Sequence, residues 1–454
     1  MSKKKIITFI LLSVITIPIC LYISSIIHLS LTDGLNDLSF PKLSAVINSV
    51  VTNERHLKVY ILIQSLLFLL SFFITFVQKN SIYESDVGNI TDTIKTPIVV
   101  GQGQHGTARW LKEKEFEKVF NKNVLDASKK LEELKFKEGG LIVGYKKQKN
   151  GNEDIYYIGD NTHTLTVGAT RSGKTRTIVL ETIGNLGLAG ESMIISDPKS
   201  EIFHYTSDFL EQLGYEVIVI DFKSPKKSNR YNYLQPVIDA LKEGDLRKAE
   251  EYAWNITTSL VGEDNGKMER IWRDGEMSII AGTIMAVVYE NMEHPEFQNL
   301  TNVYTFISEM CRTENGVMPM NDYIKKLKTT NPASRVFNVA RIAPEKTRGS
   351  FFTSALATLR LFTSDSVYAM TSDSDFSLKD TGKRKRVIYI VLPDENTTYY
   401  PLASLFVNQQ YTSLVEVADG RGGELENRTN FILDEFRKFY NNSCFFKYAN
   451  SWWW

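Results

Sequence analysis

A glycine-rich octapeptide at positions 168–175 restricts this chain to a small group of folds. Its residues are Gly168, Ala169, Thr170, Arg171, Ser172, Gly173, Lys174 and Thr175, which match the pattern G-x-x-x-x-G-K-[ST]. The alternating residues 164–167 predict a strand before the loop, and the pattern of 177–188 predicts an amphipathic helix after it. A chance glycine turn is the alternative, but this order of strand, loop and helix favours an α/β P-loop domain.

Each residue type in the octapeptide suits a task in phosphate binding. Glycines let backbone N–H groups surround the β-phosphate of a nucleotide at a helix N-terminus. Lys174 is expected to reach the β- and γ-phosphate oxygens, and the hydroxyl of Thr175 is expected to ligate Mg²⁺. The motif therefore predicts ATP and Mg²⁺ as cofactors.

A second acidic motif is needed to complete such a site, and two segments compete for the role. Residues 430–433 are mainly apolar and lead into Asp434 and Glu435, while residues 193–196 lead into Asp197. Asp434 is predicted to hold Mg²⁺ through water, and Glu435 to polarise the attacking water as a general base. Asp197 lies closer to the octapeptide along the chain, but it has no adjacent base, so the sequence favours Asp434.

Two long apolar runs stand at the N-terminus. From Ile6 to Leu31 the single ionisable side chain is His28, and residues 59–77 form a second apolar run. Each is long enough to cross the hydrocarbon core of a bilayer, which needs roughly 20 residues. A signal peptide is the alternative for the first run, but that run is too long, lacks a small-residue cleavage site and is followed by a second span.

The lysines that flank these runs indicate their orientation. Lys3, Lys4 and Lys5 precede the first run and Lys79 follows the second, which places both ends inside by the positive-inside rule. The intervening residues 32–58 also carry basic residues, so the bias is weak, but an ATP site requires cytoplasmic nucleotide. We therefore expect a multi-pass protein of the cell membrane with its soluble part in the cytoplasm.

Composition narrows the remaining choices. Lys plus Arg and Asp plus Glu both total 53, so no global positive field indicates nucleic acid as a partner, and any DNA contact must be local. Cys20, Cys311 and Cys444 show neither metal-ligand spacing nor an even count. This argues against a zinc site or a disulfide framework and fits a reducing compartment.

The motifs, taken in order, resemble the TraG/TraD-like coupling proteins of conjugation and type IV secretion. The resemblance runs from the two apolar runs to Phe436, and it includes a very long insert between the two nucleotide motifs. Its parts are residues 105–110 (His-Gly-Thr-Ala-Arg-Trp), 168–175, 196–201 (Ser-Asp-Pro-Lys-Ser-Glu), 231–234 (Tyr-Asn-Tyr-Leu), 349–362 and 431–436 (Phe-Ile-Leu-Asp-Glu-Phe). Family members often carry Gly where this chain has Arg171, a replacement we expect to be tolerated because the backbone N–H alone faces phosphate.

The resemblance implies a fold. It implies a membrane anchor over residues 1–80, a RecA-like nucleotide-binding α/β domain over 81–238 and 366–454, and an inserted all-α domain over 239–365. Helical spacing of Met277, Ile280, Ile284 and Val287 supports the insert independently, as does the apolar pattern of residues 356–361. The β-branched residues 386–392 predict a return to the sheet.

The resemblance also implies a function. Such a chain is expected to be a membrane-anchored ATPase that recruits a DNA–relaxase complex and helps to pump it into a type IV secretion channel. DNA would be bound without sequence preference, and six copies would form a ring. A DNA translocase of the FtsK or HerA type is an alternative, disfavoured by the insert, by the presence of two spans and by residues 196–201.

A catalytically inactive, membrane-bound remnant is the second alternative. The family continues beyond its Asp-Glu-Phe motif with a small-residue segment and more strands, whereas here Phe436 is followed by a short tail that ends in Trp452, Trp453 and Trp454. The tail resembles the product of a frameshift or a sequencing error. On this hypothesis the nucleotide-binding domain is incomplete at its C-terminus and a weak ATPase.

Two further polar segments have two interpretations each, and a third site has one. The run Lys383–Arg386 is either a solvated loop before a strand or a contact for DNA phosphates. The pair Arg109–Trp110 is either a stacked packing pair or part of the entrance to the nucleotide domain, together with His105. His163 is expected at the surface.

Overall fold

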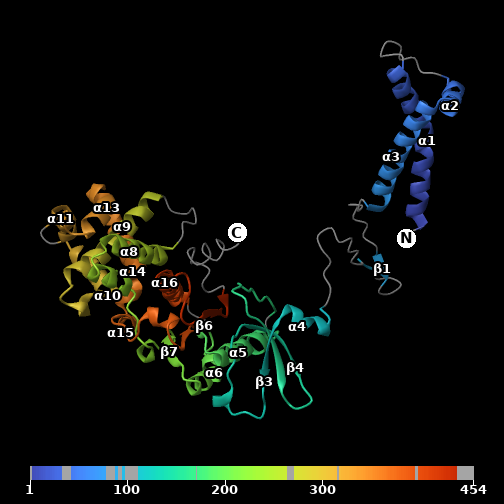
Figure 1. Ribbon diagram of the computed structural model, residues 1–454. Helices are drawn as coiled ribbons and strands as arrows, with labels where there is room; N and C mark the ends of the chain where they lie inside the picture. The colour runs from blue at the N-terminus through green and yellow to red at the C-terminus, as the bar shows by residue number, and fades with distance from the viewer. Residues whose placement is uncertain are drawn as a thin grey trace. The chain divides into compact units, whose positions relative to one another are not determined.

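The computed structural model describes residues 3–32, 42–77, 87–89, 95–97, 111–169, 171–262, 270–313, 316–393 and 397–436. The chain divides into two compact units, Met1–Leu111 and Lys112–Trp454 (Figure 1). The predicted boundary at residue 80 lies outside the described residues, as do His105, Arg109, Trp110, Thr170 and the tail beyond Phe436.

The first unit is built from apolar helices. Helix α1 covers Lys3–Thr32, α2 covers Leu43–Thr52, and α3 covers Glu54–Phe72 and continues into a π-helical turn, Phe73–Val77. Helices α1 and α3 are antiparallel, because Phe9 contacts Phe68 while His28 stacks on His56 at the other end of the pair. Two short strands, β1 (Val87–Asn89) and β2 (Lys95–Pro97), form an antiparallel ribbon in the same unit.

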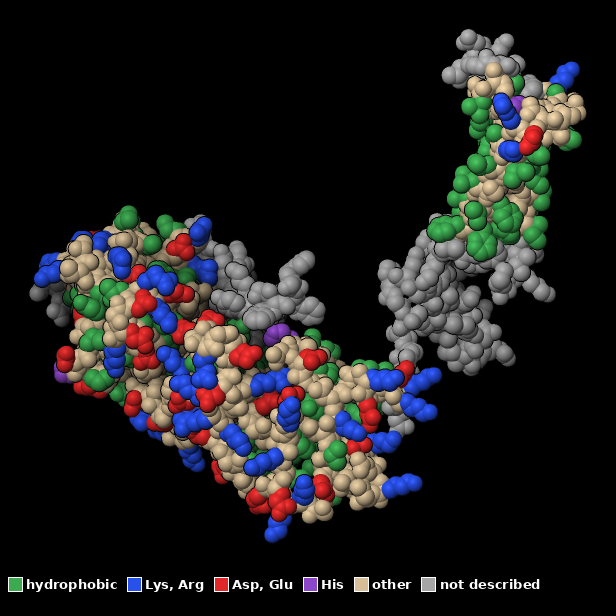
Figure 2. Space-filling view, in the orientation of Figure 1, with side chains coloured by type: hydrophobic (Ala, Val, Ile, Leu, Met, Phe, Trp, Pro, Cys, Tyr) green, Lys and Arg blue, Asp and Glu red, His purple; other side chains and the backbone are tan. Residues whose placement is uncertain are grey.

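The surface of this helix pair is apolar over most of its length (Figure 2). The segments Phe9–Thr32 and Glu54–Thr75 have mean hydropathies of 2.4 and 2.1, and each is long and apolar enough to cross a membrane. Both predicted runs are therefore helical. Between the helices lies a polar contact, in which His56 Nε2 is 3.3 Å from Ser24 Oγ and its Nδ1 is 2.9 Å from Ser49 Oγ.

The second unit is organised around a four-stranded parallel sheet. Its strands are β6 (Ser192–Asp197), β7 (Glu216–Asp221), β8 (Arg386–Val391) and β9 (Thr429–Leu433), in the order β7-β8-β6-β9. All three pairings are parallel. The strands predicted at residues 193–197, 386–392 and 430–433 are confirmed, and with the two apolar helices they confirm the predicted α/β class.

Both faces of this sheet are buried, which explains why its inner strands β6 and β8 are rich in apolar residues. Alternate side chains point to opposite faces, so Met193 and Ile195 join a core with helices α5 (Leu180–Ala189) and α6 (Glu201–Gln212), while Ile194 faces the other side. That second core is larger and continues from β7 and β8 into the long helical region between them. One apolar core therefore joins the sheet to residues within the predicted insert.

The described residues between β7 and β8 form helices and connections (Figure 1). The buried positions Ile280, Ile284 and Val287 lie on α9, as their spacing predicts. The helices of the second unit are α4 (Phe116–Val119), α5 (Leu180–Ala189), α6 (Glu201–Gln212), α7 (Gln235–Lys242), α8 (Leu246–Val261), α9 (Arg270–Glu290), α10 (Leu300–Met310), α11 (Pro319–Lys326), α12 (Ala333–Val336), α13 (Asn338–Ile342), α14 (Glu345–Leu359), α15 (Asp365–Thr371) and α16 (Tyr400–Asp419). The division into domains at residues 239 and 365 remains a prediction.

A small antiparallel sheet precedes the phosphate-binding octapeptide. It contains β3 (Asn121–Leu125), β4 (Leu141–Lys147) and β5 (Glu153–Ile158), with β5 in the centre. Asn185 of α5 attaches this small sheet to the rest of the second unit, because its side chain accepts a hydrogen bond from Asn123 and donates one to Gly140 O.

The strand predicted at residues 164–167 is wrong. These residues form no strand and are exposed, and Leu165 and Val167 retain 78% and 85% of their accessible surface. A strand requires a neighbour for its backbone N–H and C=O groups. The described part of the sheet ends at β9, which pairs with β6.

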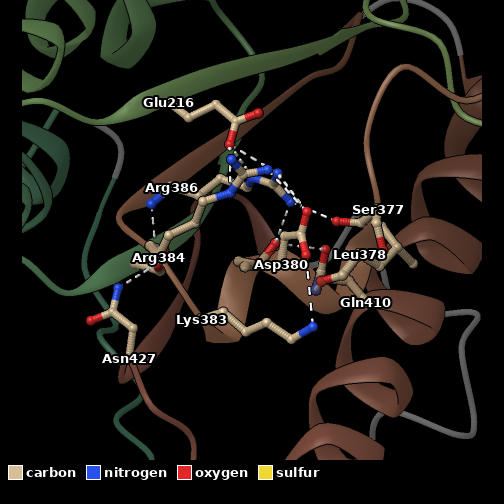
Figure 3. Close-up of polar contacts among 11 residues, drawn as sticks. Glu216, Ser377, Leu378, Asp380, Lys383, Arg384, Arg386, Gln410 and Asn427 are labelled. Carbon is tan, nitrogen blue, oxygen red and sulfur yellow. Dashed lines mark hydrogen bonds and ion pairs between the residues drawn. The ribbon is translucent and has the colours of Figure 1, made fainter.

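Residues 383–385 of the basic run form an exposed loop before the strand, as one of the two interpretations predicts, whereas Arg386 belongs to the strand. Arg386 is fully buried at the start of β8, where its guanidinium contacts Glu216 at 2.9 Å and Asp380 at 3.8 Å (Figure 3). Arg384 pairs with the same two carboxylates, and Lys383 lies 3.9 Å from Asp380. This cluster of ion pairs anchors residues 377–382 to the amino ends of β7 and β8.

Candidate functional site

The phosphate-binding octapeptide leads into a helix that begins with an unusual turn. Residues Thr175–Val179 are π-helical and continue into α5. The predicted helix is therefore present, with a first turn of a kind that is frequent at functional sites. Thr177 donates both its backbone N–H and its hydroxyl to Gly173 O, which fixes the turn against the loop.

Two glycines are needed for the shape of the loop. Gly173 has a φ of 87°, which a residue with a side chain rarely adopts. A Cβ at Gly168 would lie 2.8 Å from Ser172 Oγ and 3.2 Å from Lys174 Cδ, so a side chain there would fill the curl of the loop.

Lys174 and Thr175 lie at the mouth of this curl and are partly exposed. The Lys174 ammonium donates to Gly168 O at 2.7 Å and to Ala169 O at 3.2 Å, so it bends back over the loop. Thr175 Oγ1 donates to Asp434 Oδ2 at 3.0 Å. The structure thus brings together the two predicted motifs, which are 259 residues apart in sequence.

Asp434 directly follows β9, and its backbone is held by the neighbouring strand. Ser196 Oγ donates to Asp434 O at 2.6 Å, from the end of β6. Sequence reasoning gave Ser196 no role beyond its place in a motif. The available signal was a hydroxyl at the end of an otherwise apolar strand.

Asp197 has a different environment. It is 1% exposed, and its Oδ2 accepts the backbone N–H of Phe203 at 2.8 Å, close to the start of α6. Burial raises the pKa of the Asp197 carboxyl, and hydrogen bonds from the backbone of residues 199, 200 and 203 act in the opposite direction. Asp197 thus serves the turn between β6 and α6.

Glu435 is exposed next to Asp434, and its φ of 52° lies in the left-handed region. Its backbone N–H donates to Asp434 Oδ1 at 3.1 Å. A non-glycine residue in this region carries a conformational cost that the surrounding structure must offset, and such residues gather at functional sites.

Arg171 departs from the expectation drawn from the sequence. Its φ is 63°, so the backbone at this position carries a steric cost for any residue with a side chain, which glycine would relieve. The side chain itself is exposed, so space is not the limiting factor.

A family model for the Type IV secretory system Conjugative DNA transfer family matches residues 109–439. This match includes both nucleotide motifs and the helical region between them. The chain belongs to this family. The predicted resemblance to conjugative coupling proteins is thereby confirmed, and the FtsK or HerA alternative is not favoured.

Two groups of curated relatives agree with this assignment. The conjugal transfer protein TraG of Escherichia coli is 25% identical over 355 residues, which are 73% of this chain and 53% of that protein. The protein VirD4 of Rhizobium radiobacter is 25% identical over 283 residues, which are 62% of this chain and 38% of that protein. The chain thus spans about half the length of the curated relatives it matches.

Solved structures of the coupling protein TrwB are distant neighbours. TrwB in complex with ADP and Mg²⁺ aligns with a TM-score of 0.37 and 14% identity, over 63% of this chain and 66% of that one.

Proposed function

We propose that this member of the conjugative DNA transfer family is a membrane-anchored ATPase that acts as a coupling protein. It would recruit a DNA–relaxase complex and help to pump it into a type IV secretion channel. The single observation that carries the ATPase part is the hydrogen bond between Thr175 and Asp434, which joins the phosphate loop to the end of β9. Family membership supports the rest.

The residues around the loop fit a nucleotide and a divalent cation. A Cβ at position 168 would obstruct the curl of the loop. Because Gly168 has no Cβ, the backbone of the loop can surround phosphate. A hydroxyl and a carboxylate already in contact, from Thr175 and Asp434, are oxygen ligands of the kind that Mg²⁺ prefers. A solved structure of TrwB, to which this chain is distantly similar, contains ADP and Mg²⁺.

Each residue then has a role in ATP hydrolysis. Backbone N–H groups of residues 168–175 would hold the phosphates. Lys174 would leave the carbonyls of Gly168 and Ala169 to neutralise phosphate charge. Thr175 and Asp434 would hold Mg²⁺, which supplies charge neutralisation when bound. Glu435, exposed beside Asp434, would orient and deprotonate the attacking water.

The two apolar helices would anchor this site at the cytoplasmic face of the membrane. We propose that Phe9–Thr32 and Glu54–Thr75 span the bilayer with both ends of the pair inside. DNA, the relaxase, the channel proteins and a homo-hexameric ring are the proposed partners. The domain boundaries at residues 80, 239 and 365 belong to the same proposal.

The test uses the full chain purified in detergent. We expect Mg²⁺-dependent ATP hydrolysis that Glu435→Gln abolishes while ATP binding persists, because the base acts in the chemical step alone. Lys174→Ala should remove ATP binding itself. Arg176→Ala, at the exposed residue just beyond the motif, is the matched control and should leave both measurements unchanged. ATP binding that survives in Lys174→Ala, or an absence of turnover in the parent chain, would show that the proposed activity is wrong.

A further inference from the structure

A second pocket lies away from the phosphate loop, among α7, α8, α16 and residues 374–379. Its volume is about 520 Å³, which is within the range of ligand sites, roughly 300–1,000 Å³. None of the proposed nucleotide-site residues among those described lines it. The pocket is therefore distinct from the proposed nucleotide site.

One polar side chain in this pocket lacks a partner. Asn408 of α16 is 7% exposed, lines the pocket, and makes no side-chain hydrogen bond within the part of the chain that the structure describes. The next two amides of α16 are satisfied, since Gln409 donates to Tyr233 O and Gln410 donates to Leu378 O. The Asn408 amide is accessible from the pocket, so it is available to a ligand that can both donate and accept.

The charge of the lining favours a cation. Four carboxylates, two of them already in ion pairs, line the pocket against Lys248 and Lys379, and Lys379 makes no ion pair among the described residues. Asp375 pairs with Arg230, and Glu416 accepts from Lys248 at 3.2 Å and from the Tyr252 hydroxyl. The carboxylates left to face a ligand are those of Asp239, which accepts from Gln235, and of Glu243, whose side chain is exposed.

Part of the pocket lining is apolar and is held in place by neighbouring side chains. Phe376 and Leu378 contribute to it, together with Ile256 of α8. The buried guanidinium of Arg386 donates to Ser377 O at 2.6 Å and lies 5.7 Å from the centre of the Phe376 ring. Figure 3 shows how Arg386 and Gln410 approach residues 377 and 378. This apolar part of the lining is therefore held in place before a ligand arrives.

We propose that this pocket binds a lysine or arginine side chain presented by a segment of a partner protein. The aliphatic stem would lie against Phe376 and Leu378, and the cation would meet Asp239 and Glu243. Asn408 would pair with a backbone amide of the segment. A free polyamine fits less well, because it has donors alone and would leave the Asn408 N–H groups without an acceptor.

The experiment measures peptide binding to the full chain in detergent by fluorescence anisotropy. The probes are labelled pentapeptides of alanine with a central arginine, glutamine or glutamate. The arginine peptide should bind at least about tenfold more tightly than the other two. Asn408→Leu should weaken it about tenfold, and Glu243→Gln about threefold, since exposed charge pairs are weak. Glu211→Gln, on the exposed face of α6, is the matched control.

A variant that is expected to tighten binding distinguishes loss of the contact from loss of folding. Asn408→Asp adds a carboxylate at the same place and should tighten the arginine peptide, a gain that misfolding does not produce. Equal affinity for the three peptides overturns the proposal, as does an arginine peptide that is unaffected by Asn408→Leu and Asn408→Asp. Spermidine that displaces the peptide at equal concentration overturns the protein partner in favour of a free cation.

Discussion

Two aspartates end neighbouring strands of the parallel sheet, and their surroundings differ in kind. Asp434 accepts from Thr175 of the phosphate loop, whereas Asp197 accepts from Phe203 in the turn that precedes α6. The contact with Thr175 therefore distinguishes Asp434 from Asp197, the two candidates that the sequence offered for the acidic motif. The assignment of Mg²⁺ to Asp434 follows from it as a proposal.

Matched substitutions separate the two residues. Asp434→Asn should lower Mg²⁺-dependent ATP turnover by about 10–100-fold, the range expected when an oxygen near a bound metal loses its charge. Asp197→Asn keeps an oxygen for the Phe203 N–H and should change turnover less than about threefold. Steady-state ATPase assays on both variants decide the matter, and the reverse order of effects would transfer the metal role to Asp197.

The buried Asp197 carboxyl also gives a pH dependence to stability. Its folded-state pKa is raised, so this group favours folding fully below its unfolded value of about 3.8, and the contribution is lost as pH rises through the folded pKa. Asp197→Asn removes that loss. We expect the variant to be as stable as the parent at pH 7 or more so, with the difference shrinking toward pH 4. Thermal melts at both pH values measure it, and a variant with a lower Tm at pH 7 contradicts the sign.

Arg386 offers a test of the ion-pair cluster at the base of the sheet. Its side chain is fully buried, while those of its partners Glu216 and Asp380 are 39% and 33% exposed. Because solvent screens the two carboxylates, Arg386→Met should destabilise the second unit by about 2–3 kcal/mol, below the cost of breaking a fully buried pair. Urea unfolding checks the value. Lys383→Met, at the exposed end of the same run, should cost less than about 0.5 kcal/mol.

At the level of helices and strands, the local pattern of apolar residues predicted the elements that are stabilised by burial of an apolar face. The strands β6, β8 and β9, the helix α9 and the two apolar helices were all foreseen, because continuous or periodic apolar residues mark a buried face wherever the neighbours come from. Residues 164–167 carry a similar local pattern but form no strand. Pairing depends on a neighbour, and a local pattern does not encode which strand that neighbour is.

The same limit applies to the sites. The octapeptide motif named the loop, and the acidic motif named Asp434, but the positive φ of Arg171 and the burial of Arg386 depend on tertiary contacts. A run of four basic residues predicts an exposed segment when the sequence is considered alone. The last of the four, Arg386, is buried because Glu216 and Asp380, from two other segments, pair with it.

The helix pair of the first unit allows a topology test. If α1 and α3 span the membrane with both ends inside, a reporter fused directly after Val77 should behave as cytosolic, because three lysines stand at the start of α1. A fusion within residues 33–41, between the spans, should be exported. Alkaline phosphatase and fluorescent-protein fusions at the two points give opposite signals, and an active phosphatase after Val77 would reverse the arrangement.

Across the whole molecule, one core runs from the strands β7 and β8 into helices α8 and α9 of the predicted insert. A fragment of residues 112–454 should therefore unfold in a single cooperative transition. Differential scanning calorimetry measures it, with the ratio of calorimetric to van't Hoff enthalpy as the criterion. Two resolved transitions would support an insert over 239–365 that folds by itself.

The strand order has a consequence for how this protein is made. Strand β6 lies between β8 and β9, and both of these emerge from the ribosome late, β8 about 190 residues after β6 ends. At roughly 5–20 residues per second, a continuous apolar strand waits about 10–40 s for its first neighbour. Helices α6 to α15 and strand β7 are synthesised during that interval. The nascent chain thus depends on early helix formation, or on a chaperone that covers β6, to avoid aggregation until its synthesis is complete.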